Sequence, residues 1–223
     1  MKVAVYAEDG TCLGQATSRP RRITEYPRWG ERDMDESWHD CAQSVRRALS
    51  SAGLSGADVD AVGICGHGDG LYLVDENGRP VRRAVLATDS RTTDLVATWR
   101  SDGLVDELRS TTGLHLAEPS PAALYAWLAR YEPDVARRAR WLLGAKDWLR
   151  LCLTGEVGTD YSEGIAGFGC LDGSDYAPHI ADLLGIPQVM DRLPPMAGPT
   201  DIAGTITRTA AAECGLRPGT PAV

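Results

Sequence analysis

A cluster of glycines separated by two ionisable residues is the first place in this sequence where ligand chemistry could occur. It is Gly66-His67-Gly68-Asp69-Gly70, directly after Val59–Cys65, which we expect to be a buried strand. A glycine-rich turn at the carboxyl end of a buried strand leaves room for a ligand and would hold His67 and Asp69 at the mouth of a pocket. The alternative is a tight turn with two solvated polar residues. The spacing fits neither G-x-G-x-x-G nor a Walker loop, so it predicts no nucleotide site.

Two further groups of charged residues adjoin expected strands and helices. Asp89 lies in Thr88-Asp-Ser-Arg91, at the end of an expected strand, and Lys146-Asp147-Trp148 opens an expected helix. An aspartate just before a helix is most often its N-cap, and a charged first helical turn is usually solvated, with the tryptophan in the core. Each group therefore has a structural alternative. The four histidines are too scattered for a zinc site, and no nucleophile elbow or Cys–His arrangement is evident.

The elements that must position these groups alternate between strand and helix periodicity. In the first third of the chain we expect a hairpin of Lys2–Ala7 and Cys12–Ser18 around Asp9-Gly10, a helix capped by Asp33 with Glu36 and ended by Gly53, and strands at Val59–Cys65, Leu71–Val74 and Val81–Ala87. In the middle we expect a helix begun by Ser120-Pro121 and closed by Pro133, a strand at Trp141–Leu143 and a helix at Ala145–Leu153 before Gly155. The stretch past Ser162 is expected to be loop-like, followed by a weak strand at Ile202–Ile206 and a helix at Arg208–Cys214. This order predicts a mixed α/β domain with a partly antiparallel sheet.

Composition excludes several classes of partner. The 223 residues suffice for one large domain, and the formal charge of −8 argues against binding to nucleic acid or to an anionic membrane surface. No signal peptide or membrane-spanning apolar run is visible, so we expect a cytoplasmic protein. The six cysteines are irregularly spaced, which predicts reduced and mostly buried thiols.

Five stretches together resemble one known family. They are Val62–Pro80 around the glycine cluster, Ala84–Arg91, Trp29–Asp33 continuing to Trp38, Lys146–Arg150 with Leu153–Glu156 and Thr159-Asp160, and Gly219-Thr220-Pro221. In order and spacing the chain is similar to the N-terminal, sugar-binding domain of FGGY carbohydrate kinases. The Gly-His-Gly-x-Gly-Leu-Tyr-Leu run most resembles the L-xylulose and erythritol kinases. Two departures agree with this: Ala87 stands where many members carry Trp, and Leu124 where many carry Lys.

The resemblance implies an ATP-dependent phosphorylation of a pentulose or polyol hydroxyl, with Mg²⁺ accompanying the ATP in the complete enzyme. It implies that Asp69 contacts the substrate, that His67 and Gly68 flank Asp69, and that Asp89 lies on the same side of the sugar pocket. A carboxylate at Asp69 could accept hydrogen bonds from two vicinal hydroxyls. The implied partner is a small sugar or polyol. Many members are homodimers, which leaves a homodimer of the complete enzyme open.

The implied fold is ribonuclease H-like, the actin-like ATPase superfold, with a mixed sheet and flanking helices. Compared with the family, residues 1–223 form an incomplete domain. The first strand with its Asp-x-Gly-Thr, the catalytic Asp expected beyond Val223 and the ATP-binding domain are missing, so we expect this part to hold neither ATP nor Mg²⁺ firmly. The missing strand would leave up to ~10 ladder hydrogen bonds unmade, at about 1 kcal/mol each.

Three hypotheses follow. The first is a kinase domain that is inactive as an isolated fragment. The second is a non-catalytic sugar-binding module or the product of a decayed gene. The third is another member of the same superfold. A binding module should fold alone and bind a polyol, whereas a fragment should do neither well.

Overall fold

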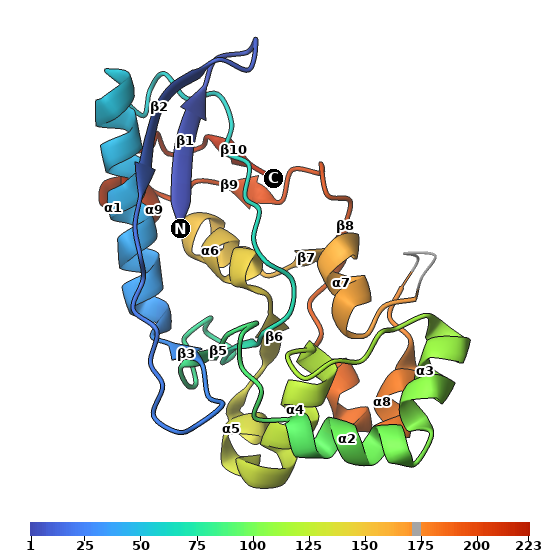
Figure 1. Ribbon diagram of the computed structural model, residues 1–223. Coiled ribbons are helices and arrows are strands. Elements are labelled where there is room, and N and C mark those ends of the chain that lie inside the picture. Colours follow the sequence, from blue (N-terminus) through green and yellow to red (C-terminus); the bar gives the residue numbers. More distant parts are fainter. Residues whose placement is uncertain (171–174) are drawn as a thin grey trace.

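The computed structural model describes residues 1–170 and 175–223, which form a mixed arrangement of helices and short strand pairs (Figure 1). The helices are α1 (Met34–Ala52), α2 (Thr93–Ser101), α3 (Leu104–Thr112), α4 (Pro121–Tyr131), α5 (Pro133–Arg138), α6 (Ala145–Thr154), α7 (Tyr161–Gly167), α8 (Pro178–Leu183), the 3₁₀ helix η1 (Pro187–Arg192) and α9 (Arg208–Cys214). None of these described helices has the length and apolar character needed to cross a membrane.

The described strands form separate two-stranded pairs. They are β1 (Lys2–Tyr6) with β2 (Cys12–Thr17), β3 (Glu31–Arg32) with β5 (Ala84–Val85), β4 (Tyr72–Val74) with β6 (Trp141–Leu143), β7 (Thr159–Asp160) with β8 (Met196–Ala197), and β9 (Gly204–Thr205) with β10 (Pro221–Ala222). Only β7 and β8 run parallel; the other pairs are antiparallel. Strand pairs joined by helices confirm the predicted mixed α/β class.

The N-terminal hairpin forms at the predicted turn and lies on α1 (Figure 1). Gly10 supplies the positive φ of 84° that an Asp-Gly hairpin turn requires. Gly14 permits the close approach of β2 to the helix, because a Cβ atom there would lie 2.5 Å from the backbone nitrogen of Ala52. The glycine is therefore required by packing at this point.

The termini of α1 and α6 follow the predicted capping residues. The Asp33 carboxylate accepts a hydrogen bond of 2.9 Å from the backbone N–H of Glu36, and α1 ends at Gly53, whose φ is 69°. Gly155 ends α6 in the same left-handed conformation, with φ 77°. Local sequence thus sets both ends of the helix that supports the hairpin and the end of the helix that follows β6.

Three clusters of buried apolar residues support the two ends of the molecule and the region between them. One lies among α2, α3, α4, α8 and η1, and a second lies among α1, α9 and the C-terminal strands. The third consists of Met34, Tyr72, Val74, Ala84, Leu143 and Trp148, where α1, the central strand pairs and α6 meet. Because Tyr72 and Trp148 also border the cleft described below, this third cluster forms the rigid base of the candidate site.

The predicted buried strand at Val59–Cys65 is wrong in its burial and extent. Val62 N–H donates to the carbonyl of Pro221 at 2.9 Å and Ile64 N–H to that of Val223 at 3.1 Å, so the segment pairs with the chain's last residues on one edge. The side chains of the segment differ in burial: Val62 and Ile64 pack against the second cluster, whereas Cys65 is exposed. The segment, which contains Asp60 and Gly63, is therefore half-exposed and pairs along a single edge.

Other boundaries also differ from the predictions. Pro133 does not simply close a helix but begins α5, where proline's fixed φ and missing N–H suit the first helical turn. The stretch past Ser162 contains α7, α8 and η1, although short helices rich in glycine and proline give a weak periodic signal. Its residues 171–174 lie outside the described part of the chain. The strand expected at Val81–Ala87 reduces to β5.

A polypeptide of just these 223 residues is expected to melt below about 60 °C and to self-associate. Within the described residues, β1 pairs only with β2, and Val62–Ile64 pairs only with the C-terminal residues, so two backbone edges have unpaired donors and acceptors. Differential scanning calorimetry with light scattering measures both properties. A reversible transition of a monomer above about 60 °C would contradict the expectation.

Candidate functional site

A cleft of about 590 Å³ lies beside the predicted glycine-rich turn. Its residues come from the start of β1, the loop before β3, β3 itself, the first turn of α1, the glycine-rich turn, β4, the segment after β5 and the start of α6. They are Met1, Lys2, Arg22, Arg32, Ser37, Cys65, Gly66, His67, Tyr72, Leu86, Ala87, Thr88, Ala145, Lys146, Trp148 and Leu149. Pockets for small ligands usually measure roughly 300–1,000 Å³. The cleft is therefore large enough for a sugar. Ala87 contributes to this space, since a bulky residue there would occupy part of it.

The backbone of the turn is held on both sides. Asp69 adopts a φ of 63° and Gly70 a φ of 83°, and Gly70 N–H donates to the carbonyl of Pro119 at 2.8 Å. Gly66 packs against the start of α6, because an added Cβ would lie 3.2 Å from the Cβ of Lys146. A left-handed conformation at a non-glycine residue is uncommon, and Asp and Asn are among the few that adopt it readily. The turn therefore presents its side chains from a defined backbone.

The predicted residues of the turn do not all face the same space. His67 is exposed and borders the cleft, and its Nδ1 lies 3.1 Å from the carbonyl oxygen of Gly68. Gly68 is exposed, with open space where a side chain would be. Asp69 is half-buried and is not among the residues that border the cleft. Partial burial raises the pKa of Asp69, and nearby His67 works in the opposite direction.

Asp89 is buried and belongs to an ion-pair network. Its side chain accepts hydrogen bonds from the backbone N–H groups of Gly30, at 2.7 Å, and of Arg91, at 2.9 Å. The Arg91 guanidinium adds bonds of 3.0 Å and 2.9 Å to the two oxygens and also reaches Glu31 at 2.8 Å. Both carboxylate oxygens already accept two hydrogen bonds, which leaves no free position for a sugar. This geometry suits a residue that holds the loop and not one that contacts a ligand.

The group at Lys146 is more buried than a solvated first helical turn. The Lys146 ammonium lies 3.0 Å from Asp147 Oδ1 and 2.8 Å from Asp160 Oδ2, while Asp147 Oδ2 accepts from Gly144 N–H and the Thr159 hydroxyl. Burial alone would lower the pKa of Lys146, but the charges of Asp147 and Asp160 outweigh it and raise this pKa. Lys146 thus remains cationic at the border of the cleft, with its charge already balanced.

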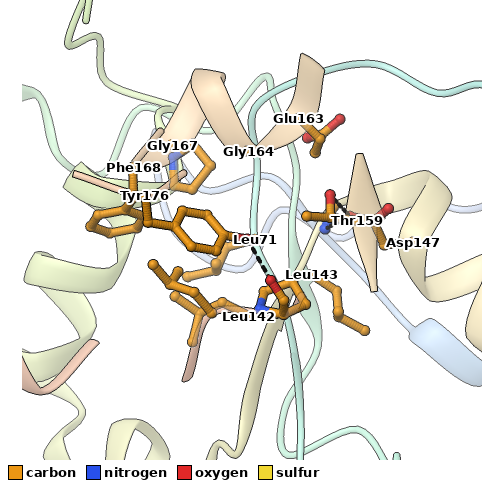
Figure 2. A pocket seen from close by; sticks show the side chains of 14 residues that line it. Leu71, Leu142, Leu143, Asp147, Thr159, Glu163, Gly164, Gly167, Phe168 and Tyr176 are labelled. Carbon is orange, nitrogen blue, oxygen red and sulfur yellow. Dashed lines mark hydrogen bonds between the residues drawn. The ribbon is translucent and has the colours of Figure 1, made fainter. Parts of the chain in front are cut away.

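A smaller cavity of about 40 Å³ is bordered by Leu71 and by residues of β6, α6 and α7 (Figure 2). Figure 2 shows Asp147 and Thr159 joined by their hydrogen bond, with Phe168 and Tyr176 on the other side of the view. A cavity of this volume has room for a small number of water molecules, well below the roughly 300 Å³ of a small ligand site. We therefore place the candidate site at the larger cleft.

Glu163, on α7, has the most perturbed carboxyl group near the turn. Burial, followed by the charge of Asp147, raises its pKa to about 7; Asp160 and Asp69 add to the rise, and Lys146 opposes it. Asp69 is therefore close enough to Glu163 for the two charges to interact. The side of the turn that faces α7 is acidic, whereas the cleft side is basic.

The raised pKa of Glu163 predicts a loss of stability as pH rises from about 4.5 to about 7. The unfolded chain has the ordinary glutamate pKa of about 4.5, so across this range the folded state binds more protons than the unfolded state and the free energy of unfolding falls. Glu163→Gln should remove this part of the pH dependence. Urea unfolding at pH 5 and pH 8 measures the free energy of unfolding of the unmodified protein and of the variant. An unchanged difference between the two pH values in the variant would contradict the assignment.

Sequence patterns missed several residues that border the cleft. Arg22 and Arg32 lie in and at the end of a loop rich in proline, arginine and tryptophan, which gave no periodic signal. Tyr72 and Trp148 were expected in a strand and in a core, and they are buried there while also forming the apolar floor of the cleft. Only the tertiary fold brings these positions together.

The fold matches solved structures of sugar kinases. The xylulose kinase from Rhodospirillum rubrum superposes with a TM-score of 0.83 at 24% identity, over 99% of this chain and 45% of that chain. The gluconate kinase from Lactobacillus acidophilus gives a TM-score of 0.90 at 17% identity, over 100% of this chain and 44% of that one. At these identities the likeness shows the fold, which is the predicted actin-like one.

Sequence comparison identifies the family. Residues 1–223 match the N-terminal domain of the FGGY family of carbohydrate kinases, and the chain belongs to this family. It is 34% identical, over its whole length, to 45% of the L-xylulose/3-keto-L-gulonate kinase of Escherichia coli K12. It is 31% identical to a probable L-xylulose kinase of Pasteurella multocida, over 100% of this chain and 46% of that protein. An autoinducer-2 kinase of Klebsiella pneumoniae is also 31% identical, over 95% of this chain and 40% of that one. The chain thus spans slightly less than half the length of these relatives.

Proposed function

We propose that these residues form the sugar-binding part of a kinase that transfers the γ-phosphoryl group of ATP to a hydroxyl of a pentulose or polyol. The observation that carries the proposal is the Gly66–Gly70 turn, with its left-handed backbone at Asp69 and Gly70, at the border of a cleft of sugar size in a chain that belongs to a carbohydrate kinase family. The relatives named as L-xylulose kinases support a pentulose as the first substrate to test.

The role proposed for the turn is to bind and orient the sugar. Asp69 would accept hydrogen bonds from two neighbouring hydroxyls, and His67, exposed at the border of the cleft, would donate or accept one more. Gly68 leaves the space between them open. Orientation matters because phosphoryl transfer depends mainly on alignment of the attacking oxygen and on neutralisation of charge.

In the reaction, a bond forms between the sugar hydroxyl oxygen and the γ-phosphorus while the bond from that phosphorus to ADP breaks. The hydroxyl proton passes to a carboxylate. The described residues contain no group of three His, Cys, Asp or Glu side chains that could hold a metal ion. Mg²⁺ belongs to the proposal only as the usual companion of the ATP phosphates.

The test is ADP release coupled to a spectrophotometric assay, with the protein produced at the full length of its gene and L-xylulose, erythritol and glycerol compared. Saturable, ATP-dependent phosphorylation of L-xylulose or erythritol above glycerol is expected. Because the relatives are more than twice as long, a polypeptide limited to residues 1–223 should show no turnover in the same assay. Sugar-independent ATP hydrolysis alone, or no binding of any sugar by the full-length protein, would overturn the proposal.

A further inference from the structure

The cleft beside the turn is basic in an acidic chain. The sequence has 31 Asp and Glu against 23 Lys and Arg, yet the residues that border the cleft include Lys2, Arg22, Arg32 and Lys146 and no Asp or Glu. A cleft lined by charges of one sign concentrates counter-ions of the other sign. The distribution therefore favours an anionic group inside the cleft.

Three of these cations, the exposed Lys2 and the two arginines, have no ion-pair partner among the described residues. Lys146 is balanced by Asp147 and Asp160, but neither Arg22 nor Arg32 forms an ion pair with a described carboxylate. The Nε atom of Arg32 is buried without a hydrogen-bond partner. A buried guanidinium nitrogen that donates to nothing carries a desolvation penalty, which a ligand oxygen would remove.

The backbone places the two arginines opposite each other. Ile23 and Glu31 form an antiparallel bridge with reciprocal hydrogen bonds of 2.8 Å and 2.9 Å, so the next pair in register is Arg22 with Arg32. Side chains directly opposite in an antiparallel pair have Cβ atoms about 4.5–5.5 Å apart, and like charges there are destabilising. Two arginines held in this relation, with no carboxylate on the cleft surface, form a fork for one anion.

We propose that Arg22 and Arg32 bind an oxyanion that the sugar ligand carries: the carboxylate of a sugar acid used as substrate, or the phosphate group of the sugar phosphate. Both groups match the paired N–H donors of guanidinium side chains. The proposal rests on the proposed function for the identity of the sugar, whereas the binding of an anion at the arginine pair does not depend on catalysis. Tyr72, beside Arg32, borders the same space with a phenol whose pKa is raised by burial, with the Arg32 charge acting in the opposite direction.

The test uses the protein at the full length of its gene, with Arg22→Met and Arg32→Met and with Arg21→Met as the matched control. Arg21 is exposed and adjacent to Arg22 but does not border the cleft. First, inorganic phosphate is titrated by ³¹P line broadening and D-gluconate by saturation-transfer NMR, which need no turnover. Binding of one or both anions should weaken about ten-fold in each cleft variant and remain unchanged in the control.

Kinetic measurements then separate the two sources of the anion. If the arginines bind a substrate carboxylate, the KM for 3-keto-L-gulonate should rise about ten-fold while that for L-xylulose changes less than about two-fold. If the arginines bind the phosphate group, the KM values for 3-keto-L-gulonate and L-xylulose should remain unchanged, and product inhibition by the phosphorylated sugar should weaken. Unchanged anion binding in both cleft variants would overturn the proposal. If the unmodified protein has no kinase activity but binds the anion, and both cleft variants weaken that binding, the arginine site is supported and the proposed function is contradicted.

Discussion

Replacing Arg91 with methionine is expected to lower the free energy of unfolding by about 3–5 kcal/mol, because it leaves the buried Asp89 carboxylate without its cation, while Glu31 keeps its ion pair with Arg82. The Arg91 side chain is 1% exposed, and its guanidinium bonds both Asp89, 0% exposed, and Glu31, 4% exposed. It also lies 3.9 Å from the centre of the Trp29 ring. Urea unfolding followed by tryptophan fluorescence measures the loss.

Two comparison variants make this expectation specific. Arg28→Met removes an ion pair with Asp94 whose side chains are 52% and 89% exposed, so it should change stability by less than about 0.5 kcal/mol. Arg91→Lys keeps a positive charge but loses the planar fork, and its loss should fall between those of the two methionine variants. A loss below about 1 kcal/mol for Arg91→Met would show that the network does not hold the loop as described.

Replacing Asp69 with asparagine is expected to weaken sugar binding about ten-fold or more, because hydrogen bonds from hydroxyls to a charged acceptor are lost. Asparagine is the appropriate substitution, since it tolerates the φ of 63° that Asp69 adopts and an alanine would add backbone strain. The apparent affinity for ATP should remain within about two-fold, because the change concerns the acceptor site alone. The KM values for L-xylulose and ATP measure both effects.

A matched control lies in the next turn of the chain. Glu76 is exposed between β4 and the strand segment that follows, away from the cleft, so Glu76→Gln removes one negative charge without touching the turn. It should leave both KM values unchanged. Equal sugar affinity in Asp69→Asn and in the unmodified protein would remove Asp69 from the site.

Local signals in the sequence predicted the elements whose determinants are local. The hairpin at Gly10, the cap of α1 at Asp33 and the end of α6 at Gly155 each depend on residues within a few positions of one another. The predicted burial of Val59–Cys65 was wrong, because burial depends on which elements cover each face of the segment. Apolar content alone cannot supply that information.

The candidate site also has parts that local sequence predicts and parts that depend on the tertiary fold. The glycine-rich turn was visible in the sequence because glycines and flanking strands mark it. Asp89 could equally be a cap, a ligand contact or an ion-pair partner, and only its neighbours Arg91 and Gly30 show that its oxygens are occupied. Arg22 and Arg32 border the same cleft because a single backbone bridge at Ile23 brings a loop back onto β3, which no spacing rule indicates.

The central claim is that the turn at Gly66–Gly70 binds the sugar, and a crystal structure of the full-length protein with L-xylulose tests it most directly. We expect density for the sugar against the turn, at the border of the cleft, with hydroxyl oxygens within about 3.2 Å of the Asp69 carboxylate and of a His67 ring nitrogen. Sugar bound elsewhere in the protein, with no polar contact to either side chain, would contradict it.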